Sequence, residues 1–352
     1  MSAIDEGGGI AHPGGKVTLT EIAAHAKVSR STVSLVLRES PLVNEKTRAR
    51  VRESIEALDY VYDRGAARMR GRTSQTIGLV VTDLTNSFYA EFIAGVDAAL
   101  DAGGRIALLA NTGEDLDRQR RVLERFREHA VDGVVLCAAE GASPAFVDRL
   151  RDWGMPCVQA LREVEGASAD FVGTDNRLGT EMATEHLVRR GHRSIVFIGG
   201  AAETSVSHLR RQGYADAMRA NGLSPVIFRC RSTKEEAALA AREAFAGDDA
   251  PTAAVCFNDP VAMGVTLGVR QLGRTPDEDV AVIGFDDTAD AALWVPRLSS
   301  IAIHPAEIGS AAAGLLMRRI GDPDGAPERI IVPPRLVARD STRRVLEHAG
   351  AA

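Results

Sequence analysis

The side chains best suited to chemistry in this chain are the polar residues that follow Ser29. Ser29 can cap a helix whose inward face is formed by Val33, Val36 and Leu37. The N-terminal end of such a helix is the part that meets base edges in a major groove of DNA. Guanidinium and hydroxyl groups placed there can hydrogen-bond to the bases. The outward residues predicted to contact DNA are Arg30, Ser31, Thr32, Ser34 and Leu35.

A preceding short helix must position these side chains. Thr18 can cap it, and Glu21 three residues later completes a capping box. Its apolar face follows helical spacing at Leu19, Ile22, Ala23 and Ala26. The pair predicts a helix-turn-helix, although two ordinary amphipathic helices of a core stay open as the alternative for this segment alone. Further predicted DNA contacts are Thr18, Leu19 and Arg38.

A third helix and the charge distribution support this interpretation. Asn44 can cap a helix that runs to about Leu58, which gives a small three-helix head. Residues 16–73 hold twelve Lys or Arg against seven Asp or Glu, whereas the whole chain has a net charge of −6. A basic head on an acidic body is typical of a phosphate-binding module, so double-stranded DNA is the predicted partner. Acidic residues interleave the run 46–52, and a solvated charged face is the alternative there.

The segment 63–72 connects this head to the rest of the chain. It contains four Arg and two Gly and has little to bury. A helix of one or two turns is marginal in water, so the segment cannot form a stable helix alone. An ordinary flexible basic linker and a helix that forms only on DNA are both compatible with these residues.

From Thr76 onward, apolar runs alternate with helical stretches, which predicts a doubly wound α/β body. Roughly 270 residues are too many for one core, so two lobes with a cleft between them are expected. Ligands of such sheets lie at the carboxyl ends of the strands. The predicted strands are Ile77–Val81, Ile106–Leu109, Gly133–Leu136, Pro156–Val158, Ile195–Ile198, Ala253–Cys256 and Val280–Gly284. The clearest predicted helices are Ser87–Leu100, Leu116–His129, Arg177–Arg190 and Pro260–Leu272.

Motifs of common enzymes are missing from the sequence. It has no dinucleotide-binding Gly-x-Gly-x-x-Gly after a strand, no phosphate-binding loop and no Gly-x-Ser-x-Gly. The four Cys are dispersed and are predicted to be buried thiols. We therefore expect no enzyme activity, no catalytic residue, no metal and no cofactor. The Gly-rich start has no apolar core and no run is long enough to span a bilayer, so a cytoplasmic protein is expected.

The chain resembles the lactose-repressor family of bacterial transcriptional regulators from about Val17 to about Arg339. The matching residues are Leu19–Ala23, Val28–Ser29, Thr32–Ser34, Val36–Leu37, Val43–Asn44 and Thr47–Arg48. The resemblance implies a helix-turn-helix head, a hinge and a two-lobed body like the periplasmic sugar-binding proteins. It also implies a repressor that binds a palindromic operator as a homodimer and is controlled by a small effector, a sugar or a related metabolite. A small-molecule binding protein without a DNA role is the alternative.

The resemblance assigns roles in the hinge and exposes departures in the head. Met69 matches the residue that relatives wedge between base steps of the minor groove, and Arg68 and Arg70 match phosphate contacts. Lys27 stands where many relatives have Gly, so a side chain must fit a turn that Gly fits most easily. Many relatives also have other residues at positions 35 and 38, which puts the operator sequence in doubt. The same resemblance places the dimer contacts near residues 91–100 and 118–126.

The predicted effector site comes from the strand-end loops and from the resemblance. By resemblance, Arg210 reaches ligand hydroxyls or carboxylates, Asn258 hydrogen-bonds the ligand and Asp286 accepts two ligand hydroxyls. Position in the loops adds Phe88 and Tyr89, either of which can stack on a sugar or instead pack under its lobe, and the strand-terminal Asn111. Relatives often have Asp near Leu161, whereas this chain continues with Arg162. Two arginines facing Asp286 suggest a hydroxylated effector that also bears an acidic group.

The expected domain organisation follows from these segments. Residues 1–15 form a disordered extension, 16–62 the DNA-binding head and 63–73 the hinge. The effector-binding body spans 74–340, followed by a tail at 341–352. Its N-lobe takes about 74–173 plus 304–332, and its C-lobe about 174–303 plus 333–340.

Overall fold

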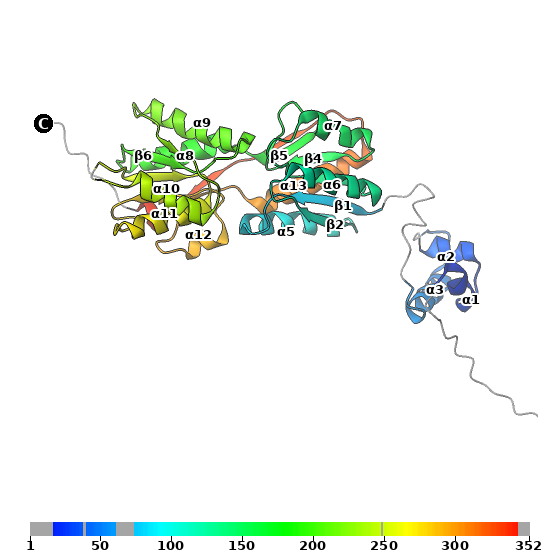
Figure 1. Cartoon of the computed structure of the whole chain (residues 1–352). Helices are drawn as coiled ribbons and strands as arrows, with labels where there is room; N and C mark the ends of the chain where they lie inside the picture. The colour runs from blue at the N-terminus through cyan, green and yellow to red at the C-terminus, as the bar shows by residue number, and fades with distance from the viewer. Residues whose placement is uncertain (1–16, 38–39, 61–73, 248, 344–352) are drawn as a thin grey trace, which may run out of the picture. The chain divides into compact units, whose positions relative to one another are not determined.

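A computed structural model describes residues 17–37, 40–60, 74–247 and 249–343 (Figure 1). By contacts, the chain separates into two compact units, Met1–Arg72 and Thr73–Ala352, which are described separately. The first unit holds a three-helix head. The second holds two parallel sheets with helices on their faces.

Three short helices build the head around one apolar cluster. They are α1 (Leu19–His25), α2 (Arg30–Val36) and α3 (Glu45–Ala57). Ile22, Val33 and Val51, one from each helix, are fully buried in that cluster. A helix of seven residues is unstable alone, so shared burial and side-chain caps hold these helices. The predicted three-helix head is confirmed.

The N-lobe is a six-stranded parallel sheet of order β11-β5-β4-β3-β1-β2. Its elements are β1 (Thr76–Val81), α5 (Ser87–Asp101), β2 (Ile106–Asn111), α6 (Leu116–Glu128), β3 (Gly133–Leu136), α7 (Pro144–Asp152), β4 (Cys157–Ala160), β5 (Asp170–Thr174), α13 (Pro305–Gly321) and β11 (Arg329–Val332). Side chains of α6 and α7 pack in one cluster with this sheet, and those of α5 and α13 pack in another. Both faces are therefore covered, as parallel sheets require.

The C-lobe repeats the pattern with a four-stranded parallel sheet of order β7-β6-β8-β9. Its elements are α8 (Asn176–Arg189), β6 (Ile195–Ile198), α9 (Ser205–Ala220), β7 (Ile227–Phe228), α10 (Lys234–Ala244), β8 (Ala253–Cys256), α11 (Asp259–Gln271), β9 (Ala281–Ile283), α12 (Ala289–Leu293), β10 (Ser300–Ala302), β12 (Arg335–Val337) and the 3₁₀ turn η1 (Asp340–Thr342). Helices α10 and α11 cover one face, and α8 and α9 pack with the other.

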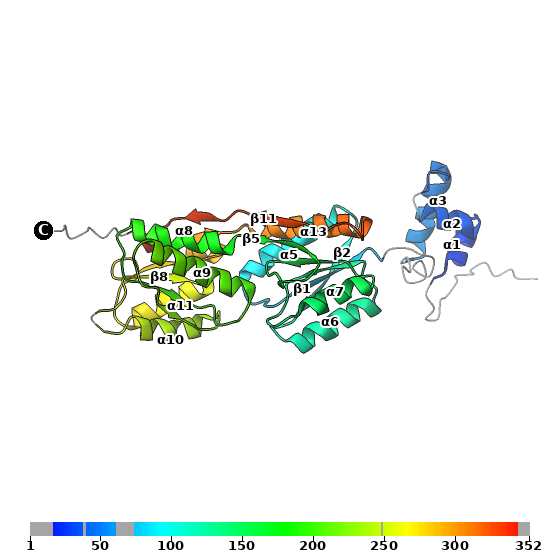
Figure 2. The same ribbon diagram turned by 90° about the horizontal axis from the view of Figure 1, so that it is seen from above.

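Three chain crossings join the two lobes (Figure 2). The chain leaves the N-lobe sheet after β5, returns after β10 through α13, and leaves again after β11. Strands β10 and β12 form a short antiparallel pair where two crossings run together. At one of these crossings, His304 is the N-cap of α13 and has a left-handed backbone at φ 53°. The largest apolar cluster is continuous from one lobe to the other.

The predicted doubly wound α/β class is confirmed. All seven predicted strands exist, and the four clearest helices begin and end within about two residues of their predicted bounds. Sequence reasoning missed β5, β7, β10, β11 and β12. Most of these are two to four residues long, which is too short for a burial pattern to be recognised. The four cysteines are buried free thiols, as predicted.

Candidate functional site

The first candidate surface is the beginning of α2 in the head. Ser29 Oγ accepts the backbone N–H of Thr32 at 3.1 Å and lies 2.7 Å from Ser31 Oγ. This cap fixes the first turn of the helix. Arg30 and Ser31 are exposed there, and Thr32 and Ser34 are half-buried. An exposed guanidinium beside hydroxyl groups at a helix start is chemically suited to base edges and phosphates.

The other predicted DNA contacts of the head have mixed surroundings. Thr18 is exposed and forms the predicted capping box, because its backbone N–H donates to Glu21 Oε2 at 2.6 Å. Leu19 and Leu35 are half-buried and pack against the apolar cluster of the head. The predicted contacts that lie outside the described residues are Arg38, Arg68, Met69 and Arg70.

One basic residue of the run 46–52 has a structural role. Arg48 Nη2 donates to the carbonyl oxygens of Ser40 at 2.9 Å and Val43 at 3.3 Å, and only 12% of its side chain is exposed. Arg50 and Arg52 are exposed. In the turn between α1 and α2, the backbone of Lys27 is left-handed at φ 51°. This is the turn position that was expected to fit Gly most easily.

The second candidate site begins with Arg210 of α9 in the C-lobe, on the side predicted to face the cleft. Nε donates to Asn176 Oδ1 at 2.8 Å, Nη1 to the Phe257 carbonyl at 2.5 Å, and Nη2 lies 3.4 Å from Asp286 Oδ1. The guanidinium also lies over the ring of Phe285, 3.6 Å from its centroid. Only 7% of the side chain is exposed. These contacts hold the guanidinium in one orientation.

Two buried carboxylates lie near this arginine. Burial raises the pKa of Asp286 to about 6, although Arg210 favours its charged form, and the negative charge of Glu91 adds to the rise. Burial and the neighbouring Asp286 raise the pKa of Asp259 to about 8. Asp259 accepts hydrogen bonds from the backbone and hydroxyl of Thr288 and from Ser300 Oγ, at 2.7, 3.1 and 2.6 Å. It therefore holds the loop after β9 in place.

Asn258 precedes Asp259 and is nearly buried. Its side-chain oxygen accepts the backbone N–H of Val261 at 3.1 Å and so caps α11. The predicted ligand contact thus has a structural role at the carboxyl end of β8. Arg210, Asn258 and Asp286 meet at the carboxyl ends of parallel strands of one sheet, the usual location for a ligand.

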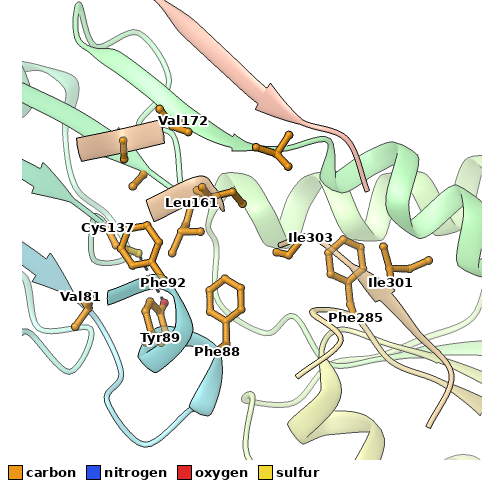
Figure 3. Close-up of a cluster of buried hydrophobic side chains, with 14 of the residues drawn as sticks. Val81, Phe88, Tyr89, Phe92, Cys137, Leu161, Val172, Phe285, Ile301 and Ile303 are labelled. Atoms are coloured by element: carbon orange, nitrogen blue, oxygen red, sulfur yellow. Dashed lines mark hydrogen bonds between the residues drawn. The ribbon is translucent and has the colours of Figure 1, made fainter. Parts of the chain in front are cut away.

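Phe88 and Tyr89 begin α5 on the N-lobe side of the cleft (Figure 3). Phe88 belongs to the apolar cluster that continues across the lobes to Phe285 and Ile303. Tyr89 is directed into its own lobe, where its hydroxyl lies 2.8 Å from Thr82 Oγ1 and 3.7 Å from Cys137 Sγ. These contacts favour packing for Tyr89, although Phe88 and Tyr89 are equally buried at 7% exposure, and stacking on a ligand stays a prediction.

Arg162 follows β4 and is paired within the N-lobe. Its Nη1 lies 2.7 and 2.8 Å from the two carboxylate oxygens of Glu114 and 3.4 Å from the Ala138 carbonyl. The side chain is 19% exposed and borders a cavity of about 830 Å³ that is also lined by the start of α9. The predicted Asn111 ends β2, and its Oδ1 is buried with no hydrogen-bond partner among the described residues.

Left-handed backbone at non-glycine residues recurs beside these groups. Leu161 has φ 66°, and Arg162 N–H donates across it to the Ala160 carbonyl at 2.7 Å, which turns the chain sharply. Glu114 has φ 62° and Asp286 has φ 106°. Such conformations cost about 1 kcal/mol or more each and cluster at functional sites. Backbone strain therefore accompanies both ion pairs, Arg162 with Glu114 and Arg210 with Asp286.

Sequence reasoning missed four contributors to the site. They are Glu91, Glu114, Asn176 and Phe257. Asn176 follows the cap of α8, where a polar residue needs no ligand to explain it. The position of Glu114 in the loop after β2 was the available signal, since that loop follows a strand predicted to end at the cleft.

Comparison with known protein families gives two matches. The model for bacterial regulatory proteins of the lacI family matches residues 18–63, and the model for a periplasmic binding protein-like domain matches residues 184–342. The maltose regulon regulatory protein MalI of Escherichia coli is 32% identical and covers 92% of this chain and 98% of its own length. The ribose operon repressor of Escherichia coli is 31% identical over 92% of this chain and 99% of its own.

Solved structures with the same architecture include two complexes. The lac repressor dimer bound to operator and the anti-inducer ONPF superposes with a TM-score of 0.83 at 22% identity, over 93% of this chain and 99% of that chain. The complex of the transcriptional regulator CelR with cellobiose gives 0.71 at 29% identity, over 93% and 100%. Within the part of the chain that the structure describes, no helix is both long and apolar enough to cross a membrane.

Proposed function

This chain belongs to the lacI family of bacterial regulatory proteins, and we propose that it binds a palindromic operator as a homodimer under control of a small hydroxylated effector. Membership of this family makes it a DNA-binding repressor with a sugar-type effector domain and not an enzyme. The observation that carries this proposal is the capped start of α2, with Arg30 and Ser31 exposed on a basic head. Such a regulator acts beside its DNA, in the cytoplasm.

Direct contacts with the operator are assigned to the head and the hinge. In the head, α2 enters the major groove, and the beginning of α1 lies against the DNA backbone. The residues of α2 that read the groove are Arg30, Ser31, Thr32, Ser34 and Leu35. In the hinge, Met69 wedges between base steps of the minor groove, and Arg68 and Arg70 contact phosphates. A head this small buries little surface, so two copies are needed for tight binding.

Exposed apolar residues of the body support a homodimer. Ile106, Leu108 and Leu109 lie on β2, the edge strand of the N-lobe sheet, and are 61%, 40% and 41% exposed. In the C-lobe, Leu293 and Val295 beside α12 are 80% and 69% exposed. We assign both patches to contact with a second copy, because an open apolar edge invites pairing. Helix α6 is a poorer candidate because arginines occupy much of its exposed face.

The effector is placed in the cleft, between Arg210 and Asp286 on one side and Phe88 and Arg162 on the other. The ribose operon repressor and the cellobiose complex of CelR support a sugar-type ligand. An effector can act only through its different affinities for the two states of the body, so closure of the lobes must alter the hinges to change DNA affinity.

Binding of the purified protein to its own upstream DNA, with and without a sugar panel, tests the proposal. We expect sequence-specific binding that at least one sugar shifts. A chain lacking residues 1–73 is expected to lose DNA binding and to keep its ligand. The variant Met69→Gly is expected to bind the operator more weakly. Full duplex affinity of the truncated chain, or no DNA binding by the intact one, contradicts the proposal.

A further inference from the structure

We infer that the effector cleft selects an uncharged hydroxylated ligand and rejects its acidic counterpart, because each arginine of the cleft is already neutralised by a carboxylate of the protein. The inference rests on the proposed function, since it takes this cleft as the effector site. It reverses the suggestion, drawn from the sequence, that Arg162 and Arg210 accept an acidic group.

The N-lobe arginine has a built-in counterion. Glu114 receives Arg162 Nη1 on both carboxylate oxygens, and Glu114 Oε2 also accepts the backbone N–H of Glu140 at 3.1 Å. Both partners are held by the left-handed backbone at Glu114 and Leu161. The pair is therefore part of the folded lobe, and a ligand carboxylate must compete with a preformed intramolecular partner.

The same arginine still has donors to offer. Among the described residues, Nε and Nη2 of Arg162 have no hydrogen-bond partner, and neither is a fully buried orphan. These two nitrogens carry three N–H groups, and N–H groups of a charge-balanced guanidinium can donate to neutral hydroxyl oxygens. They bring no net positive charge with which to attract an anion.

The C-lobe arginine is balanced more completely. All three guanidinium nitrogens of Arg210 have protein partners, and Asp286 lies beside it with 6% of its side chain exposed. An anion that displaced Asp286 would leave a buried carboxylate without its counterion, which is strongly unfavourable. A hydroxyl can instead donate to Asp286 without breaking the pair.

Across the cleft, like charges face each other. Glu91 of α5 raises the pKa of Asp286 in addition to burial and despite the opposing effect of Arg210. Burial lowers the pKa of Arg210, the neighbouring carboxylates oppose this, and the charge of Arg162 adds to the fall. Two cations thus share the cleft with three carboxylates, those of Glu91, Glu114 and Asp286. An additional anionic group meets an unfavourable field, whereas a neutral polyol does not.

The cavity beside Arg162 has the same sign of charge. Four glutamates, two arginines and His208 are the acidic and basic side chains that line its 830 Å³. Two of the glutamates are paired, Glu163 with Arg329 and Glu203 with both Arg211 and Arg229. The charged residues are Glu140, Glu163, Glu165, Glu203, Arg162 and Arg329. Among the described residues, Glu140 and Glu165 form no ion pair with an arginine, so the lining keeps two carboxylates that disfavour an acidic ligand.

A small dianion tests the inference without knowledge of the natural effector. Sodium malonate is titrated into the full-length protein and into Glu114→Gln by calorimetry at constant ionic strength. We expect malonate to bind the variant at least fivefold more tightly than the wild type, because Arg162 is then uncompensated. The double variant with Arg162→Met should lose this gain. Glu124→Gln, an exposed residue of α6, is the control for an equal change in net charge.

Two results would overturn the inference. One is tight malonate binding by the wild type that Arg162→Met abolishes, and the other is no gain in Glu114→Gln. A second measurement uses matched pairs, D-glucose with D-glucuronate and D-galactose with D-galacturonate. In any pair that binds, the neutral member is expected to bind at least tenfold more tightly, and the reverse order contradicts the inference. Neither measurement involves DNA, so failure here is separate from failure of the proposed operator binding.

Discussion

The two sides of the cleft hold their arginines in different ways. On the C-lobe side, Arg210 is enclosed by Asn176, Phe257, Phe285 and Asp286, and 7% of its side chain is exposed. On the N-lobe side, Arg162 has one carboxylate and one carbonyl as partners, and its partner Glu114 is 37% exposed. The comparison teaches that equal charges in one cleft can have separate roles. Arg210 supports the fold of its lobe, and Arg162 is available to tune recognition of the effector.

The largest expected effect is that of Arg210→Met. It leaves Asp286 buried without its counterion, so the free energy of unfolding should fall by about 3 kcal/mol. Urea unfolding of the body measures this. Arg219→Met on the same helix is the control, because its pair with Asp216 is exposed and should contribute under about 0.5 kcal/mol. A loss below about 1 kcal/mol for Arg210→Met would remove the contrast between the two sides.

A second effect concerns pH on the C-lobe side. Burial and Asp286 raise the pKa of Asp259 to about 8, whereas in an unfolded chain it ionises near 3.8. Between these values the folded protein retains a proton that the unfolded chain releases, so this group lowers stability as the pH rises. Asp259→Asn mimics the protonated form. The free energy of unfolding of the variant, measured relative to that of the wild type, should increase by at least about 1 kcal/mol between pH 5 and pH 8. A constant difference across this range in urea unfolding would show that Asp259 is ionised in the fold.

On the N-lobe side, Tyr89→Phe removes a hydroxyl that is buried against Thr82 and Cys137. The expected cost is about 1 kcal/mol of stability, with effector affinity unchanged within about twofold. Tyr214→Phe is a matched control in the C-lobe, where the hydroxyl donates to the Ile195 carbonyl at 2.9 Å. A tenfold loss of effector affinity in Tyr89→Phe alone would place this ring at the ligand after all.

The smallest expected effect on stability is that of Arg162→Met. Its partner Glu114 can be hydrated once the arginine is gone, so the loss should stay below about 1 kcal/mol. The same variant should nevertheless change the affinity for an effector. Unfolding and calorimetry on one preparation measure both quantities. A stability loss equal to that of Arg210→Met would mean that the two sides of the cleft do not differ.

Local sequence signals predicted the head closely. Thr18, Ser29 and Asn44 each cap the helix that was expected to follow, and Lys27 adopts the predicted left-handed turn. Caps and helical periodicity act over three or four residues, so they can be recognised in the chain itself. The class of the body was equally accessible, because buried parallel strands have long apolar runs.

The partners within the cleft were not accessible in this way. Glu114 and Arg162 are 48 residues apart, and Arg210 and Asp286 are 76 residues apart. They meet because the order of the strands in each sheet differs from their order in the chain. The sequence predicted that Arg162 and Arg210 both face Asp286, but it did not identify Glu114 as the partner of Arg162, and it left open whether Tyr89 packs inside its lobe.

The sequence by itself determined a capped helix-turn-helix, an α/β body and the strand ends at which a ligand is predicted to bind. These features depend on neighbouring residues and on the alternation of apolar segments. Only the tertiary structure decided which charges neutralise each other. Ion pairing depends on distance and burial in space, and a carboxylate such as Glu114 has no local feature that assigns it to Arg162.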